Sequence, residues 1–419
     1  MEKLIICGGK KLTGKISASG SKNAALPLMG ASILTDEKII LRKVPDLADI
    51  RVMIKILQHI GKKISFHGGV MEIERGKETK TEAPYELVRQ MRASIIVLGP
   101  LLARFGQCRV SLPGGCAFGP RPVDLHIKGM ENLGAKITLN HGYISASAKK
   151  LKGKEMVLAG EFGSSVLGTD NVMMAATLAE GKTVIKSAAR EPECVDLAGL
   201  LVSMGAKISG AGTDTITIEG VDELTGADYT IIPDRIEVAT YLAAGVVTGG
   251  EVTVENCRPD HLENPLDFLK KVGFDIIKDE NSIKISGQGR YPLNIATGPY
   301  PGFPTDLQAI FTVIACLLPG ESHISEGIYL DRFSHILELA RLGAKIESKG
   351  SSITIKGKSK LTGAPIQASD LRCGAALALA ALMACNTTEL AGVYHIDRGY
   401  ENFEEKLRSL GAEIEREGD

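Results

Sequence analysis

The segment LGAKITL, at residues 133–139, is one of six copies of a motif that recurs through the 419-residue chain. Each copy has an apolar residue, a glycine and a short run in which polar and apolar residues alternate. The other copies are IGKKISF (60–66), MGAKISG (204–210), VGFDIIK (272–278), LGAKIES (342–348) and LGAEIER (410–416). A glycine at this place is typical of a helix C-terminus, and the alternation after it predicts a strand. The sequence therefore predicts six repeated units of about 70 residues.

Each repeat carries a second, more apolar helix and further strands. The run VATYLAAGVVTGGEVTVEN (238–256) predicts such a helix followed by a strand. Runs such as ISGAGTDTITIEG (208–220) predict hairpins around glycine turns. Each unit is expected to read helix, strand, helix, strand, turn, strand, which makes the protein α/β.

The phasing of the repeats predicts two domains. The sixth repeat ends at Asp419 without a closing strand, which residues 3–7 can supply. Circular closure of this kind puts both termini in one domain. We expect a first domain at 22–229 with three repeats and the 116 loop, and a second domain at 1–21 and 230–419 with the other three. Domains joined by two crossings can hinge, and clefts between domains are common ligand sites.

Charge and composition exclude several classes of protein. The chain has 49 Lys and Arg against 50 Asp and Glu, so no excess charge draws it to nucleic acid or to a membrane. The longest apolar run, 373–385, has the length of a buried helix, and the N-terminus lacks a signal-peptide pattern. Eight scattered cysteines without CxxC or HExxH spacing favour a reducing cytoplasm and argue against a metal site.

Two glycine-containing segments in the first half are candidates for chemistry. In SGSKN (19–23), before an apolar helix, the helix N-terminus and Lys22 would attract an anion. The segment PGGCAFGPRPVDLH (113–126) places Cys116 near Arg121, and positive charge favours a thiolate. The structural alternatives are an N-cap with an exposed lysine and an ordinary loop with an incidental cysteine.

Acidic residues open the apolar helices of the fifth and sixth repeats. Asp306 lies in FPTDLQ (303–308) and Asp370 in SDLR (369–372), and each could simply cap its helix. Lys22 and Arg92 stand at the equivalent places of the first and second repeats. Unlike charges therefore recur at equivalent positions of the repeat.

A last polar segment, HIDRGYE (395–401), follows a strand of the sixth repeat. Arg398 would be a solvated surface residue in the plain structural interpretation. Together with Lys22 and Arg121 it would bind a phosphate or a carboxylate strongly.

These motifs, in this order and over nearly the full length, resemble those of the enolpyruvyl transferase family, in particular its members that act on UDP-N-acetylglucosamine. The resemblance is carried by SGSKNAALP, MRAS, PGGCAFGPRPVDLH, AAREPE, PDRIE, FPTDLQA, DLR and HIDRGYE. It implies a two-domain inside-out α/β barrel fold with three repeats per domain and an active site in the cleft between them. It also implies transfer of the enolpyruvyl group of phosphoenolpyruvate to the 3-hydroxyl of UDP-N-acetylglucosamine, with release of phosphate. This is the first committed step of peptidoglycan synthesis, which serves cell-wall biogenesis, cell shape and division, and it requires no cofactor or metal.

The resemblance also implies residue roles. Lys22, Arg121 and Arg398 correspond to ligands of the phosphoenolpyruvate phosphate, Asp306 to the base on the sugar hydroxyl, and Cys116 to the proton donor. The implied catalytic residues are Cys116, Asp306, Asp370, Lys22 and Arg398. The implied substrate-binding residues are Lys22, Asn23, Arg92, Arg121, Pro122, Val123, Asp124, Leu125, Ser165, Val166, Asp306, Ile328, Arg372 and Arg398.

Three other functions stay open at this point. One is the sister enzyme that acts on shikimate 3-phosphate, although the Cys116 loop favours the nucleotide sugar. Another is a related transferase acting on a different uridine nucleotide, because Leu330 replaces a usual Glu and the 160–168 segment departs from the family pattern. The third, from another class, is a non-catalytic repeat scaffold.

Overall fold

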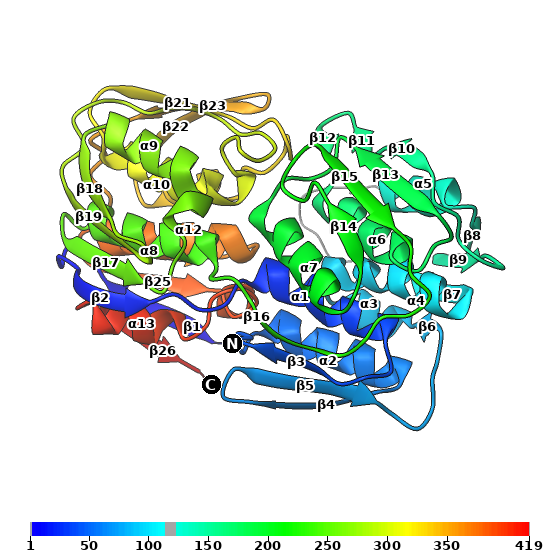
Figure 1. Cartoon of the computed structure of the whole chain (residues 1–419). Helices are drawn as coiled ribbons and strands as arrows, with labels where there is room; N and C mark the ends of the chain where they lie inside the picture. Colours follow the sequence, from blue (N-terminus) through cyan, green and yellow to red (C-terminus); the bar gives the residue numbers. More distant parts are fainter. Residues whose placement is uncertain (1, 114–122, 419) are drawn as a thin grey trace. The chain divides into compact units, whose positions relative to one another are not determined.

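The computed structural model describes residues 2–113 and 123–418, which fold into two compact units (Figure 1). Unit 2 comprises Gly20–Ile232, and unit 1 combines Met1–Ser19 with Pro233–Asp419. The sequence-based boundaries near 21 and 230 lie close to these divisions.

Six four-stranded sheets with one common strand order are present in the described ranges, three in each unit. In every sheet the first strand pairs in parallel with the second, and the other pairs are antiparallel. The sheets of unit 2 are β16 (Ala227–Thr230), β3 (Ile39–Arg42), β5 (Val70–Arg75), β4 (Lys62–His67); β6 (Glu82–Ala83), β7 (Gln107–Ser111), β9 (Tyr143–Ser147), β8 (Lys136–Asn140); and β10 (Glu155–Val157), β13 (Lys182–Lys186), β15 (Thr215–Glu219), β14 (Lys207–Ser209). The sheets of unit 1 are β2 (Thr13–Ser17), β17 (Glu251–Glu255), β19 (Ser282–Gly287), β18 (Phe274–Lys278); β20 (Asn294–Ala296), β21 (Glu321–Ser325), β23 (Ser352–Lys356), β22 (Lys345–Lys349); and β24 (Pro365–Gln367), β25 (Thr387–Ala391), β1 (Lys3–Cys7), β26 (Glu413–Glu417).

Each unit has three helices that are buried on nearly all sides and that supply much of its core. In unit 2 these are α1 (Lys22–Ala31), α4 (Leu98–Phe105) and α6 (Val166–Ala176). In unit 1 they are α8 (Arg235–Val247), α10 (Gln308–Leu317) and α12 (Leu371–Met383), which pack against one another. A helix that is apolar all round is buried, and most of the 373–385 run accordingly forms the buried helix α12, whereas Cys385 lies beyond its end and is exposed. No helix in the described ranges is both long and apolar enough to cross a membrane.

The other helix of each repeat ends at the repeated glycine. They are α2 (Ala48–Ile60), α5 (Asp124–Asn132) and α7 (Pro192–Ser203) in unit 2, and α9 (Glu263–Lys271), α11 (His335–Arg341) and α13 (Phe403–Ser409) in unit 1. The six glycines, from Gly61 to Gly411, all have φ between 92° and 111°. A side chain is strained at such φ values, so the glycine can end the helix where other residues could not. The interpretation of the motif as a helix end followed by a strand is confirmed.

Two strands, β2 and β16, lie where the chain passes from one unit to the other. β2 precedes α1 along the chain but pairs with β17 in unit 1. β16 precedes α8 but pairs with β3 in unit 2. At the other end of unit 1, β1 lies between β25 and β26, so the N-terminal strand completes the sixth sheet and both termini belong to unit 1 (Figure 1).

Polar contacts inside unit 1 fasten the two segments at which the chain leaves it. The Asp234 amide donates to the Ser19 carbonyl at 2.9 Å, and the Ser19 amide donates to Glu237 Oε2 at 2.7 Å. Lys406 Nζ donates to Ser19 Oγ at 2.7 Å and to Glu237 Oε1 at 2.6 Å. The start of α8 is therefore tied to residue 19, although they are far apart in the sequence.

Candidate active site

Asp306 is held between two arginines of unit 1. It lies in the 3-10 turn η4 (Thr305–Leu307), where Arg332 Nη1 is 2.8 Å from Oδ1 and Arg372 Nη2 is 3.0 Å from Oδ2. The Asp306 side chain is 27% exposed, against 9% for Arg332 and 5% for Arg372. Burial alone would raise the pKa of Asp306, but Arg372 and Arg332 outweigh it and hold that pKa well below 3.8. Asp306 is therefore ionised. Its side chain caps neither η4 nor α10, so the alternative interpretation of Asp306 as a helix cap is wrong.

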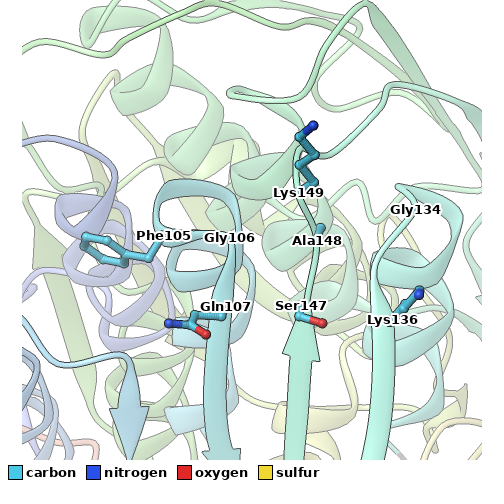
Figure 2. Close-up of a pocket in the computed structure, with 8 residues that line it drawn as sticks. All are labelled: Phe105, Gly106, Gln107, Gly134, Lys136, Ser147, Ala148 and Lys149. Carbon is cyan, nitrogen blue, oxygen red and sulfur yellow. The ribbon is translucent and has the colours of Figure 1, made fainter.

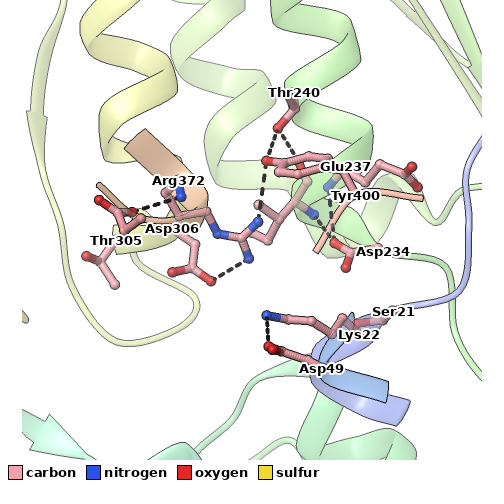
Figure 3. A network of polar contacts seen from close by, with 12 residues as sticks. Ser21, Lys22, Asp49, Asp234, Glu237, Thr240, Thr305, Asp306, Arg372 and Tyr400 are labelled. Carbon is pink, nitrogen blue, oxygen red and sulfur yellow. Dashed lines mark hydrogen bonds and ion pairs between the residues drawn. The ribbon is translucent and has the colours of Figure 1, made fainter. Parts of the chain in front are cut away.

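Arg372 is fixed from its other side by Tyr400 (Figure 3). Its Nη1 donates to the Tyr400 hydroxyl at 3.4 Å, and that hydroxyl is 2.9 Å from Thr240 Oγ1 on α8. The guanidinium carbon also lies 5.8 Å from the centre of the Tyr400 ring, at cation–π distance. The buried arginine is thus held in place while one edge pairs with Asp306.

Glu326, a residue that the sequence analysis did not single out, organises the loop after β21. Its Oε1 accepts from Thr297 Oγ1 at 2.7 Å and from the amides of Ile328 and Tyr329 at 2.9 and 3.0 Å. Its Oε2 accepts from Thr305 Oγ1 at 3.0 Å. A buried carboxylate surrounded by four donors fixes both Ile328 and the turn that carries Asp306.

Asp370 caps α12, as the plain structural alternative states. Its Oδ1 accepts from the amides of Arg372 and Cys373 at 2.9 and 3.0 Å, and its Oδ2 accepts from Ser334 Oγ at 2.9 Å. The cap positions Arg372, because that residue is in the first turn of the helix. A catalytic role for Asp370 stays a prediction.

Arg398 lies in the turn between η5 (Val393–His395) and α13 and is half-buried. Burial, followed by the positive charge of Arg398, lowers the pKa of the neighbouring His395. Arg398 therefore contributes positive charge to unit 1, on the same repeat as Arg372.

Unit 2 holds Lys22 at the first position of α1. Ser21 caps this helix by accepting from the Ala24 amide at 3.3 Å, so the N-cap interpretation of this segment is correct. The interpretation of Lys22 as exposed is wrong, because its residue is 8% exposed and its Nζ lies 3.1 Å from Asp49 Oδ2 on α2 (Figure 3). Asn23 follows it and is half-buried.

The predicted nucleotide-binding stretches lie on α5 and α6. Val123 precedes α5, and Asp124 is the exposed first residue of that helix. Leu125 packs against the start of α6: a Cβ added to Gly168 would lie 3.6 Å from the Leu125 Cβ. Ser165 caps α6 by accepting from the Gly168 amide at 3.1 Å, and Val166 begins that helix. The departing 160–168 segment runs from the hairpin of β11 (Ala159–Gly160) and β12 (Gly163–Ser164) into the first turn of α6. The described stretches are therefore neighbours within unit 2.

Three of the predicted site residues, Cys116, Arg121 and Pro122, lie outside the described residues. Arg92 begins the 3-10 helix η2 (Arg92–Val97) and is half-buried. Its charge acts on His126 of α5. In the part of the chain that the structure describes, Arg92 thus belongs to the surroundings of α5.

Two pockets are lined mainly by residues outside these contacts. One in unit 2, about 580 Å³, is lined by Phe105, Gln107, Lys136, Ser147 and Lys149, none of which is a predicted site residue (Figure 2). One in unit 1, about 210 Å³, is lined by residues that include Arg235, Asn264, Tyr300 and Pro304. Among residues 2–113 and 123–418, no group of three or more His, Cys, Asp or Glu side chains is arranged to hold a metal ion.

Asp170 on α6 is a buried acid that the sequence analysis missed. It is fully buried, and neither carboxyl oxygen has a nitrogen or oxygen donor in the described ranges. Burial is the main cause that raises the pKa of Asp170, to about 8. A hydrogen bond from the Cys194 thiol lowers this pKa, and the negative charges of Glu191 and Glu193 raise it. Between pH 4 and 8 the unfolded chain therefore carries the ionised acid while the folded chain keeps it protonated, so stability falls as the pH rises through this window.

Replacing Asp170 by Asn should remove this loss of folding stability at higher pH. The gain in melting temperature over wild type should grow from pH 5 to pH 8 and reach about 2 °C or more at pH 7, because the amide does not ionise. Thermal unfolding at pH 5, 7 and 8.5 checks this, with the exposed Asp124→Asn as control. A difference that stays constant over this range would show that Asp170 is not the titrating group.

The chain matches a protein-family profile along almost its whole length. Residues 6–407 match the profile of EPSP synthase (3-phosphoshikimate 1-carboxyvinyltransferase). The chain belongs to this family of enolpyruvyl transferases, so the predicted resemblance is confirmed. It is 51% identical, over the full length of both chains, to UDP-N-acetylglucosamine 1-carboxyvinyltransferase 2 of Carboxydothermus hydrogenoformans. It is 52% identical to UDP-N-acetylglucosamine 1-carboxyvinyltransferase of Methylacidiphilum infernorum, over 99% of each chain.

Solved structures confirm the fold class. The enolpyruvyl transferase NikO from Streptomyces tendae superposes with a TM-score of 0.89 at 23% identity, covering 99% of this chain and 98% of that one. EPSP synthase from Acinetobacter baumannii superposes with a TM-score of 0.77 at 18% identity, over the whole of both chains. The enolpyruvyl transferase fold is therefore established for this chain.

Proposed function

We propose that this protein transfers the enolpyruvyl group of phosphoenolpyruvate to the 3-hydroxyl of UDP-N-acetylglucosamine and releases phosphate. The observation that carries the proposal is the identity of about half of all residues, over the full length, to carboxyvinyltransferases named for that acceptor. The reaction would be the first committed step of peptidoglycan synthesis, carried out in the cytoplasm.

The chemistry is an addition followed by an elimination. In the addition, the sugar oxygen bonds to C2 of phosphoenolpyruvate while C3 gains a proton, and the hydroxyl proton passes to a base. In the elimination, C3 loses a proton and the bond from C2 to the phosphate oxygen breaks. We assign Asp306 as the base and, from the sequence resemblance alone, Cys116 as the proton donor. Neither step changes an oxidation state, so no redox cofactor is needed.

The arginine pair explains when Asp306 becomes basic. With Arg332 and Arg372 on its two oxygens, Asp306 is ionised but binds a proton weakly. An anionic substrate that attracts one arginine would leave an Asp306 oxygen free to accept the hydroxyl proton. The base would then gain strength only when phosphoenolpyruvate is present.

The remaining cations fit the charge of that substrate. Lys22, Arg398 and the loop residue Arg121 would bind the phosphate, with Arg92 and Arg372 as further positive charges. Such groups stabilise the charge that develops on the leaving phosphate. Asn23, Ile328 and the 121–125 and 165–166 stretches would bind the sugar nucleotide.

Comparison of acceptors tests the proposal. Phosphate release from phosphoenolpyruvate should be fast with UDP-N-acetylglucosamine and near background with shikimate 3-phosphate or with other uridine diphosphate sugars. Faster release with shikimate 3-phosphate would assign the chain to the sister activity. Faster release with another uridine nucleotide would assign it to a related transferase, and no release with any acceptor would favour a scaffold.

A further inference from the structure

Asn171 on α6 is a buried side chain whose polar atoms join three other elements of unit 2. Its Oδ1 accepts from the Gly99 amide of α4 at 2.7 Å. Its Nδ2 donates to the Ile95 carbonyl of η2 at 2.9 Å and lies 2.8 Å from His126 Nδ1 of α5. The residue is fully buried, so water does not replace these partners.

These contacts determine the orientation of the amide. The oxygen has to face the Gly99 amide, because a donor there would meet another donor. The nitrogen then has two hydrogens and two partners, the Ile95 carbonyl and His126 Nδ1. His126 Nδ1 is therefore an acceptor without a proton, and the neutral ring carries its proton on Nε2.

The surroundings keep His126 neutral. The residue is 4% exposed, and burial together with the positive charge of Arg92 lowers its pKa to about 3. Arg92, on η2, is the charged group that acts on the ring from the elements packed against α5. No described residue accepts a hydrogen bond from His126 Nε2.

We propose that Asn171 is a positioning residue that holds His126 in the Nε2–H form, so that this N–H, beside Arg92, donates to a phosphate oxygen of the nucleotide substrate. The identity of that substrate rests on the proposed function. A neutral donor with a fixed proton suits an anionic oxygen, because it offers a hydrogen bond at every pH at which the protein is folded. His126 directly follows the 123–125 stretch predicted to bind the nucleotide, which places the donor beside it in the chain.

The tautomer can be measured without any substrate. In protein labelled with ¹⁵N on histidine, long-range ¹H–¹⁵N spectra should show His126 with a protonated Nε2 and a bare Nδ1, unchanged from pH 5 to 9. A His126→Gln variant identifies the resonance among the eight histidines. In Asn171→Asp the proton should appear on Nδ1, because a carboxylate there can only accept. A wild-type ring protonated on Nδ1, or titrating in this range, overturns the proposal even if Asn171→Asp fails to fold.

Binding tests the role of the donor. By calorimetry at pH 8, Asn171→Asp should bind UDP-N-acetylglucosamine about ten-fold or more weakly than wild type, the change expected for losing a hydrogen bond to a charged oxygen. In the His126→Gln background the same change should have little further effect, since no imidazole remains to be reoriented. An equal loss in both backgrounds would mean that Asn171 is only structural. If wild type itself does not bind this nucleotide, the proposed function fails, while the spectra still decide the tautomer.

Discussion

Replacing Asp306 by Asn should lower kcat by about 10²- to 10⁴-fold, the range expected for loss of a general base. The amide has nearly the same shape as the carboxylate and still offers an oxygen to one of the arginines, so the fold of unit 1 should persist. It cannot accept the proton of the sugar hydroxyl. Steady-state rates of phosphate release, with unfolding curves to confirm the fold, measure the effect.

The matched control is Asp331→Asn, which removes the same charge from an exposed aspartate next to Arg332. This variant should keep kcat within about two-fold of wild type, since surface substitutions away from a site have small effects. If Asp306→Asn turned over at the wild-type rate, Asp306 would not be the base.

Replacing Arg372 by Met should lower kcat/KM for phosphoenolpyruvate by about 10- to 100-fold, because one charge-assisted contact is lost. It should also raise the pKa of Asp306, which keeps only Arg332 as a partner. A base works in its ionised form, so the acid limb of the pH profile should move to higher pH. Rates from pH 4 to 9 and calorimetry with UDP-N-acetylglucosamine separate these effects.

Arg290→Met is the control for Arg372→Met, because Arg290 is an exposed arginine of the same unit. It should leave both the rate and the pH profile unchanged. Affinity for UDP-N-acetylglucosamine should change by less than about three-fold in both variants. An equal loss for both substrates, or an unmoved acid limb in Arg372→Met, would contradict the assignment of Arg372.

Most of the fold could be predicted because the same local sequence pattern occurs six times. A glycine required by positive φ, followed by an alternating strand, is visible in any one copy and unmistakable across all six. The first strand of each sheet was not predicted, because the expected repeat has three strands and the observed sheets have four. These first strands have two to five residues and pair along one edge only, so they carry too little alternation to be recognised.

The candidate site could be predicted in part, because charges at helix starts repeat at equivalent positions. Lys22, Asp306 and Asp370 were found this way, and the partners that set their properties were not. Asp49 pairs with Lys22, Arg332 pairs with Asp306, and Glu326 binds Thr305 next to Asp306. All three come from other elements, so only tertiary contacts reveal the pairing. The one local signal for Arg332 was its place beside Asp331, two adjacent charged residues within a mostly apolar run.

The proposed reaction attaches the enolpyruvyl group to one particular oxygen of UDP-N-acetylglucosamine. Incubation with phosphoenolpyruvate labelled with ¹³C at C2, followed by NMR of the nucleotide product, tests this directly. We expect one enol ether carbon correlated with the proton on C3 of the sugar, formed in equal amount to the released phosphate. A label on another sugar position, or phosphate released without any labelled nucleotide, would contradict it.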